Sequence, residues 1–192
     1  MVFTASWLAF SRLQPTIQGS FLSMAFILDI PEEAENPVQF KVLARCMEVY
    51  DEYLRALGDR LPASVRQFIL APWYRDYEAH QCSYDAWLES AQFTEPATGP
   101  NQQIRRLRFE IRLLGPYHDG HIIYLYENVQ NYRLTLPGVD ESIYAAHDGW
   151  RLDEIRMTPD NKVIHEIAFK SGARWLIESD SISHSWIPLN EG

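Results

Sequence analysis

The stretch RRLRFEIRLL, from Arg105 to Leu114, decides the fold class of this 192-residue chain. Apolar and charged residues alternate strictly from Arg106 to Leu113, which is the period of an extended strand with one dry and one wet face. The apolar set is Leu107, Phe109, Ile111 and Leu113, and the charged set is Arg106, Arg108, Glu110 and Arg112. The stretch therefore predicts an antiparallel strand that packs one face on a core and exposes the other.

The same two-residue period continues on both sides of this strand. It predicts further strands over residues 87–95, 121–127, 131–136, 150–157, 163–170, 174–178 and 181–187. Glycine- and proline-containing turns separate them. Short strands with tight connections predict an antiparallel meander that folds into a sandwich or a barrel-like sheet over residues 81–192.

The first part of the chain has helical periodicity instead. Asn36 is a candidate N-cap, Pro37 suits the first helical position, and Gly58 suits the position after the last turn. Apolar residues recur at three- and four-residue spacing from Phe40 to Leu57, and a shorter helix is expected over residues 63–70. We therefore predict an α+β protein in which a helical segment, residues 1–80, packs on the β-domain as one compact unit.

Composition narrows the functional classes. The formal net charge is −9, whereas a protein that binds nucleic-acid backbone needs a basic stripe, so no nucleic-acid partner is expected. The two cysteines, Cys46 and Cys82, have neither zinc nor redox spacing and are expected to be reduced thiols in the cytoplasm. The apolar stretch 21–30 contains Ser23, ends near Asp29 and is too short to span a bilayer, so no membrane association or signal peptide is expected.

A cluster of potential metal ligands, His118, Asp119 and His121, lies between two predicted strands. The surrounding Gly-Pro and Asp-Gly pairs are typical of a hairpin tip, and this interpretation is favoured. A metal site would need a further ligand from elsewhere in the chain, with His147, Asp148 and His165 as the candidates. We expect no metal and no cofactor.

The stretch CSYDAWLES, from Cys82 to Ser90, marks the change from helical to strand periodicity. Its Asp85, Ala86, Leu88 and Ser90 resemble the (Trp/His)-Asp-Ala-x-Leu-x-Ser opening of a loose group of small bacterial β-domain proteins. The resemblance continues through residues 122–134 and 163–186, although Tyr84 stands where a histidine is frequent. It carries no catalytic signature, and because some of the group look like immunity proteins of bacterial toxin systems, it implies a protein-binding role.

The residues around this motif also have structural interpretations. Asp85 can cap its own backbone in a turn before the strand. Trp87 is expected to pack on the sheet face and to anchor the helical segment. His165 shares its predicted strand face with apolar residues and is expected to be half-buried, with Glu166 on the opposite face.

Two functional hypotheses follow. The first is a non-enzymatic, immunity-like binding protein whose partner is another protein, with aromatic anchors and acidic charge for docking on a toxin-like partner. The second is a small enzyme or ligand binder with a site in the loops around His147 and Asp148. No catalytic residue can be assigned, and the candidate binding residues are Tyr144, His147, Asp148, His118, His121 and Asp85. Convergence of the histidines in one pocket would favour the second hypothesis.

Overall fold

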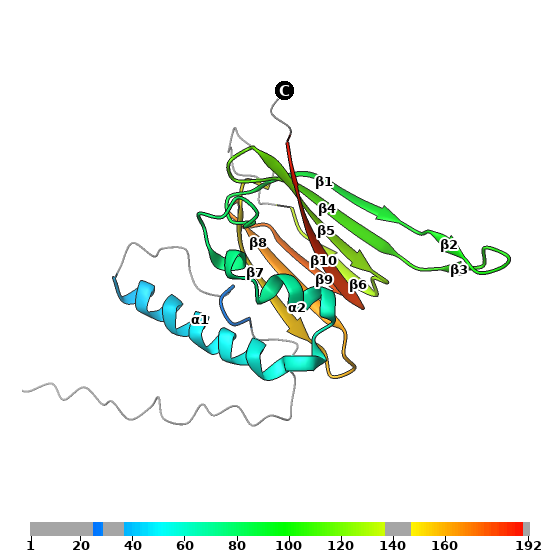
Figure 1. Cartoon of the computed structure of the whole chain (residues 1–192). Helices are drawn as coiled ribbons and strands as arrows, with labels where there is room; N and C mark the ends of the chain where they lie inside the picture. The colour runs from blue at the N-terminus through cyan, green and yellow to red at the C-terminus, as the bar shows by residue number, and fades with distance from the viewer. Residues whose placement is uncertain (1–24, 29–36, 137–146, 190–192) are drawn as a thin grey trace, which may run out of the picture.

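The computed structural model describes residues 25–28, 37–136 and 147–189, and its helices precede its strands (Figure 1). The helical elements are α1 (Pro37–Leu57), η1 (Gly58–Arg60), α2 (Ala63–Ile69) and η2 (Pro72–Arg75). The strands are β1 (Trp87–Thr94), β2 (Ala97–Thr98), β3 (Ile104–Arg105), β4 (Arg108–Leu114), β5 (Gly120–Glu127), β6 (Asn131–Leu134), β7 (Trp150–Met157), β8 (Val163–Phe169), β9 (Arg174–Ser179) and β10 (Ser181–Pro188). The predicted α+β class, with antiparallel sheets after helices, is confirmed.

The strands form two separate four-stranded antiparallel sheets. One has the order β1-β4-β5-β10 and the other β6-β9-β8-β7, so the described strands do not close into one barrel. The alternation that predicted β4 is observed: Phe109, Ile111 and Leu113 are fully buried, and the residues between them are partly exposed. The period of two therefore placed the apolar face of β4 correctly.

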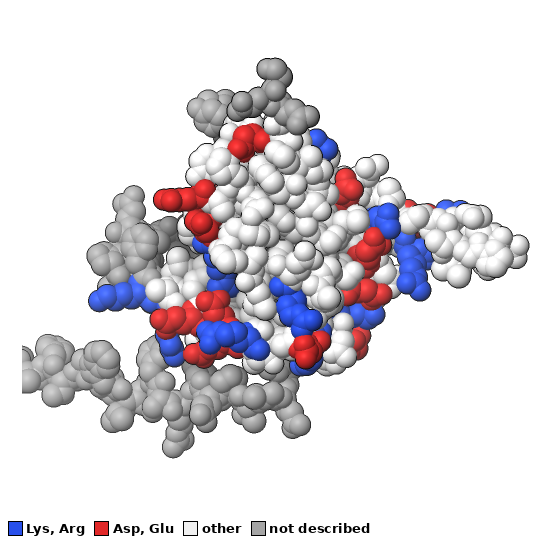
Figure 2. All heavy atoms as spheres, viewed as in Figure 1, with Lys and Arg blue, Asp and Glu red and all other residues white. Residues whose placement is uncertain are grey.

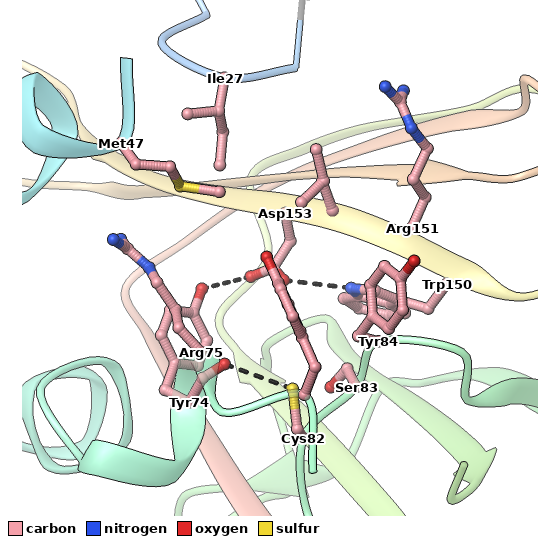
Figure 3. Close-up of a pocket in the computed structure, with 12 residues that line it drawn as sticks. Ile27, Met47, Tyr74, Arg75, Cys82, Ser83, Tyr84, Trp150, Arg151 and Asp153 are labelled. Carbon is pink, nitrogen blue, oxygen red and sulfur yellow. Dashed lines mark hydrogen bonds between the residues drawn. The ribbon is translucent and has the colours of Figure 1, made fainter. Parts of the chain in front are cut away.

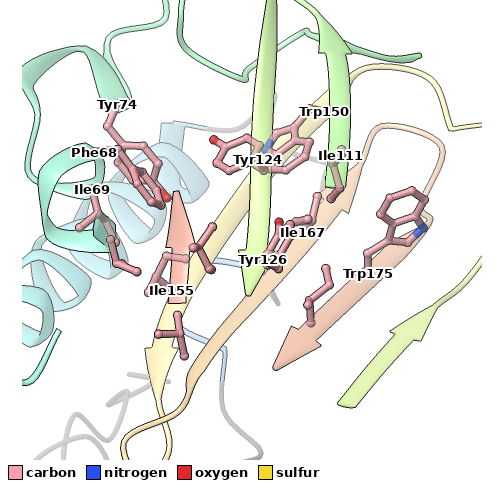
Figure 4. Close-up of a cluster of buried hydrophobic side chains, with 14 of the residues drawn as sticks. Phe68, Ile69, Tyr74, Ile111, Tyr124, Tyr126, Trp150, Ile155, Ile167 and Trp175 are labelled. Carbon is pink, nitrogen blue, oxygen red and sulfur yellow. The ribbon is translucent and has the colours of Figure 1, made fainter. Parts of the chain in front are cut away.

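One hydrophobic core joins the inner faces of the two sheets (Figure 4). Ring contacts cross it, with centroids 5.3 Å apart for Tyr124 and Trp150 and 6.2 Å apart for Phe109 and Trp175. Helix α2 covers the β10 side, where the ring of Phe68 meets Tyr124 at 5.9 Å. Each fully buried aromatic side chain contributes about 1.5–3 kcal/mol, so this core dominates the stability of the fold.

Helix α1 packs its carboxyl-terminal half on the edge of the second sheet. Tyr50, Leu54 and Leu57 are buried, as the helical spacing predicted. The Tyr50 hydroxyl donates to the carbonyl of Ile155 at 3.1 Å and accepts the Ile155 N–H, and the Tyr53 hydroxyl accepts the N–H of Met157 at 2.9 Å. These tyrosines satisfy backbone groups that edge strand β7 would otherwise leave unpaired. The side chain of Phe40 lies outside the described part of the helix.

A short segment, residues 25–28, lies against the outer face of the second sheet. The buried Glu154 carboxylate accepts the N–H of Ile27 and, at 3.0 Å, the N–H of Leu28. Arg174 donates to the Leu28 carbonyl. None of the described helices is both long enough and apolar enough to cross a membrane.

The β1–β4 hairpin extends beyond the body of the protein as an arm (Figure 1). Its outer part contains the short strands β2 and β3, where Ala97 pairs with Arg105 and Thr98 with Ile104. Almost every residue from Glu95 to Arg106 is exposed. The sequence predicted only a proline- and glycine-rich turn here, because two-residue strands carry too few positions to show a period.

Candidate functional site

The most polar part of the core is built around Asp153 of β7. Its carboxylate accepts hydrogen bonds from Trp150 Nε1 at 3.1 Å, from His165 Nε2 at 3.0 Å and from the Tyr74 hydroxyl. Figure 3 shows the side chains of Tyr74 and Trp150 directed toward it. Burial alone would raise the pKa of Asp153, but these hydrogen bonds and the nearby His165 ring hold it below its ordinary value. Asp153 is therefore an ionised carboxylate inside the protein.

His165 extends this network to the first sheet. The predicted half-burial is wrong, because His165 is fully buried, with Glu166 on the opposite face as expected. Its Nδ1 lies 2.7 Å from the hydroxyl of Tyr126 on β5. Burial raises the pKa of Tyr126, so the phenol keeps its proton while it shares a hydrogen bond with Nδ1. The other ring nitrogen, Nε2, lies 3.0 Å from the Asp153 carboxylate, so the ring links Tyr126 to Asp153.

A small pocket opens beside Asp153 (Figure 3). Tyr77, Tyr84, Cys82 and Arg151 are among the side chains that line it. Its volume is about 30 Å³, enough for about one or two water molecules, whereas pockets for small organic ligands measure about 300–1,000 Å³. In this conformation the pocket admits water and excludes an organic substrate.

The groups in this pocket are poorly suited to acid–base or nucleophilic chemistry. Three donors already occupy the Asp153 carboxylate, which leaves it little capacity to take a proton from a substrate. Burial raises the pKa of the Cys82 thiol to about 11, so it carries no thiolate near neutral pH. The arrangement instead holds η2, β5, β7 and β8 together.

Asp85 and Asp148, two of the predicted site residues, lie near the same lysine. Lys170 Nζ pairs with Asp85 and lies 5.4 Å from the centre of the Tyr84 ring. The hydrogen bond to Asp85 raises the pKa of Lys170. The negative charge of Asp148 also contributes to raising the pKa of Lys170. Asp148 also accepts the N–H of Gly149 at 2.7 Å. These contacts link the segment before β1 to the one before β7.

The predicted site histidines have separate surroundings. His118 takes a positive φ of 59° in the β4–β5 turn, and its ring lies 5.1 Å from that of Trp87. His121 points to the outer face of the first sheet, with Nδ1 2.9 Å from Glu89. His147 packs against Phe169 and Trp175, and burial lowers its pKa.

The hairpin and loop histidines therefore do not converge in one pocket. Within residues 25–28, 37–136 and 147–189, no three His, Cys, Asp or Glu side chains gather as metal ligands would. Tyr144, the remaining candidate, lies outside the described residues. Because its side chain is 47% exposed, Trp87 does not anchor the helical segment as predicted.

The outer edge of β1 offers a different kind of site. Gly115 donates its N–H to the carbonyl of Gly120, so odd-numbered residues of β4 direct their backbone groups toward β5 and even-numbered residues toward β1. In the β1–β4 register, Ala91 and Phe93 stand opposite Ile111 and Phe109. Their N–H and C=O groups therefore point away from β4, along the edge of the sheet.

That edge is open along most of its length. In the described part of the chain, β1 pairs with β4, and beyond this only Trp87 forms a single bridge, to Gly149. Phe93 is 37% exposed and stacks on Tyr132, which is 49% exposed, with ring centroids 4.6 Å apart. The open edge thus combines free backbone groups with an exposed aromatic pair.

Comparisons with protein-family models, with curated proteins and with solved structures found no match to this chain. The functional argument therefore depends on the geometry of the molecule.

Proposed function

We propose that this protein is a non-enzymatic, immunity-like module of the bacterial cytoplasm that binds another protein, adding a strand of its partner to the open edge of β1. In this proposal the two main sheets form a β-sandwich, and β1 is the edge strand left free for the partner. The observation that carries the proposal is this unpaired edge, with the backbone groups of Ala91 and Phe93 directed outward.

Strand addition uses main-chain hydrogen bonds for affinity and neighbouring side chains for specificity. β1 suits this role because its only charged residue, Glu89, is engaged by Arg112 and His121. Long open edges are usually protected by charge, proline or a covering segment, since they otherwise pair with other chains. The bulge between Leu88 and Ser90 leaves the outer half of β1 regular.

The arm supplies a second contact surface. In Figure 2 it projects as a mostly uncharged extension, with basic side chains where it meets the body. Ile104 at its outer end is 45% exposed, and Arg105 and Arg106 form no ion pair with any described residue. The net charge of −9 favours a basic partner, such as a toxin-like protein, because long-range electrostatic attraction speeds the encounter before any direct contact forms.

Other features agree with this proposal. The resemblance of residues 82–186 to a bacterial group that includes immunity-like proteins favours a protein partner. Free Cys46 and Cys82 suit a reducing cytoplasm. The alternative, a ligand site around His147 and Asp148, has less support, since the histidines are scattered and the pocket beside Asp153 is small.

The test compares two substitutions at one position. Ala91→Pro removes an outward N–H while leaving the β1–β4 hydrogen bonds in place, because edge strands accept proline where the N–H faces solvent. Ala91→Ser keeps the N–H and serves as the control. A partner is first captured from the native organism and purified, and its affinity for each variant is then measured by calorimetry.

We expect Ala91→Pro to weaken binding at least about tenfold, which corresponds to about 1.4 kcal/mol, and Ala91→Ser to change it little. Equal affinities of the two variants would reject strand addition at β1. Failure to isolate any protein that forms a stoichiometric complex would reject the protein-binding function itself.

A further inference from the structure

Residues 25–28 are held against the second sheet by the kinds of contact that hold a bound peptide. The carboxylate of Glu154 accepts the N–H of Ile27 and, at 3.0 Å, the N–H of Leu28, and Arg174 donates to the Leu28 carbonyl. Glu154 is 127 positions from Ile27, and Arg174 is 146 positions from Leu28. The side chains of Ile27 and Leu28 are buried. Distant parts of the chain therefore recognise both the donors and the acceptor of this short backbone.

The two charged groups that bind the backbone belong to one network on β7, β8 and β9. Glu154 and Glu166 stand opposite each other in neighbouring strands. Arg156 pairs with Glu166, and its Nη1 lies 3.8 Å from Glu154. Arg174 Nη1 lies 3.3 Å from Glu166. Two carboxylates and two guanidinium groups balance in charge, and their contacts hold Glu154 and Arg174 in place.

Glu154 requires amide donors from whatever lies over it. Its side chain is fully buried, and burial raises its pKa, while the hydrogen bonds from Ile27 and Leu28 lower it. Its Oε2 already has no hydrogen-bond partner among the described residues. Without the segment, Oε1 would lose two donors as well, and a buried carboxylate without donors is strongly unfavourable. Two successive N–H groups that point the same way are a common backbone arrangement for binding an anion.

The side chains of the segment have apolar surroundings. The ring of Phe26 lies 5.3 Å from that of Tyr50 and 4.8 Å from that of Tyr53, both on α1. Ile27 lines the small pocket of Figure 3, as does Met47 of α1. An occupant of this site thus needs two adjacent N–H groups, a following carbonyl and apolar side chains. These are the properties of a short apolar peptide.

We infer that Glu154 and Arg174 form a docking site for a short apolar peptide, which residues 25–28 occupy within their own chain and which the same peptide occupies when supplied as a separate molecule. The resident segment is then an autoinhibitory contact, because any other peptide must displace it. The site lies on the second sheet and is separate from the β1 edge, so it does not depend on the function proposed above.

The probe is a fluorescein-labelled peptide of sequence SMAFILDI, the sequence of residues 23–30. Fluorescence anisotropy measures its affinity for the full-length wild type and for the double variant Ile27→Ser, Leu28→Ser, whose resident segment loses its apolar contacts. A peptide N-methylated at the Leu28 position lacks one donor and keeps every side chain. Glu154→Gln, added to the double variant, tests the acceptor, and Glu110→Gln on β4 of the other sheet is the matched control.

We expect the double variant to bind the peptide at least about tenfold more tightly than the wild type, because its resident segment competes less. N-methylation and Glu154→Gln should each weaken binding to the double variant about tenfold, and Glu110→Gln should leave it unchanged. Three results would overturn the inference: no binding by a natively folded double variant, equal affinities of the double variant and the wild type, or no effect of N-methylation and Glu154→Gln.

Hydrogen exchange of the wild type tests the same inference without a variant, should the double variant fail to fold. Excess unlabelled peptide should speed exchange of the Ile27 and Leu28 amides, because it takes their place on Glu154. The amide of Phe169, which bonds to Ala173 in the β8–β9 turn, should exchange at an unchanged rate. Unaltered exchange at Ile27 and Leu28 would show that the segment is not displaced and would overturn the inference.

Discussion

Tyr50→Phe tests whether helix α1 seals the edge of the second sheet. The substitution keeps the fully buried ring and removes only the hydroxyl, which bonds both the C=O and the N–H of Ile155. Burial raises the pKa of Tyr50 well above its ordinary value, so this hydroxyl is neutral throughout the physiological range. The change therefore leaves one buried donor and one buried acceptor of β7 unpaired.

Each such group is unfavourable by about 1–3 kcal/mol, so Tyr50→Phe should lower the free energy of unfolding by about 2–6 kcal/mol. Urea denaturation followed by circular dichroism measures this as a lower midpoint with an unchanged slope. Tyr117→Phe is the control: Tyr117 is 50% exposed, and its change should stay within about 0.5 kcal/mol. A loss below about 0.5 kcal/mol for Tyr50→Phe would show that water reaches this edge and that α1 does not protect it.

Two further predictions concern β10 and the turn beside it. Burial lowers the pKa of His184 to about 4, while an unfolded histidine titrates near 6.5, so the unfolded chain takes up the proton first as the pH falls. The contribution of neutral His184 to the free energy of unfolding should therefore be fully present above about pH 6.5, and up to about 3 kcal/mol of it should be lost as the pH falls toward 4. In urea titrations at several pH values, His184→Phe should remove this part of the dependence of unfolding free energy on pH. The same pH dependence in both proteins would contradict its assignment to His184. Gly120→Ala would bring its Cβ into steric overlap with ring atoms of Trp186 and should destabilise the protein by about 1–3 kcal/mol, as thermal unfolding can measure. Gly149→Ala is the control, because its Cβ would meet only ordinary contacts, the nearest at 3.4 Å. An equal loss of stability in the two variants would refute the steric explanation.

Local sequence periodicity was enough to locate most elements. The limits of β7 are as predicted, those of β8 differ by one residue, and α1 begins at Pro37 and ends before Gly58 as its capping residues indicated. Each of these signals involves residues close in sequence. The assignment of strands to sheets was beyond this reasoning: β5 pairs with β10, and β6 pairs with β9, across long separations that alternation does not encode.

The network around Asp153 was also missed, although the sequence contained a signal for it. In the predicted strand 150–157, Asp153 shares its face with Ile155 and Met157, so the pattern places a carboxylate on an apolar face. A buried carboxylate requires several hydrogen-bond donors, so this pattern is a signal for a polar network in the core. Its partners come from η2 and β8, and only the folded chain identifies them as Tyr74 and His165.

The contrast between β1 and β7, one edge strand from each of the two main sheets, supports β1 as the proposed binding edge. β7 is engaged on every side: Asp153 binds groups inside the core, Glu154 binds residues 25–28 on the outer face, and the α1 tyrosines bond its free backbone. Helix α1 thus covers the edge strand β7, and covering an edge strand is one way in which natural sheets prevent unwanted pairing. No described segment gives β1 comparable cover, and its outward backbone groups at Ala91 and Phe93 lie beside an exposed aromatic pair. Among the described residues, β7 is covered and β1 is open, and this contrast is why we propose that a partner pairs with β1.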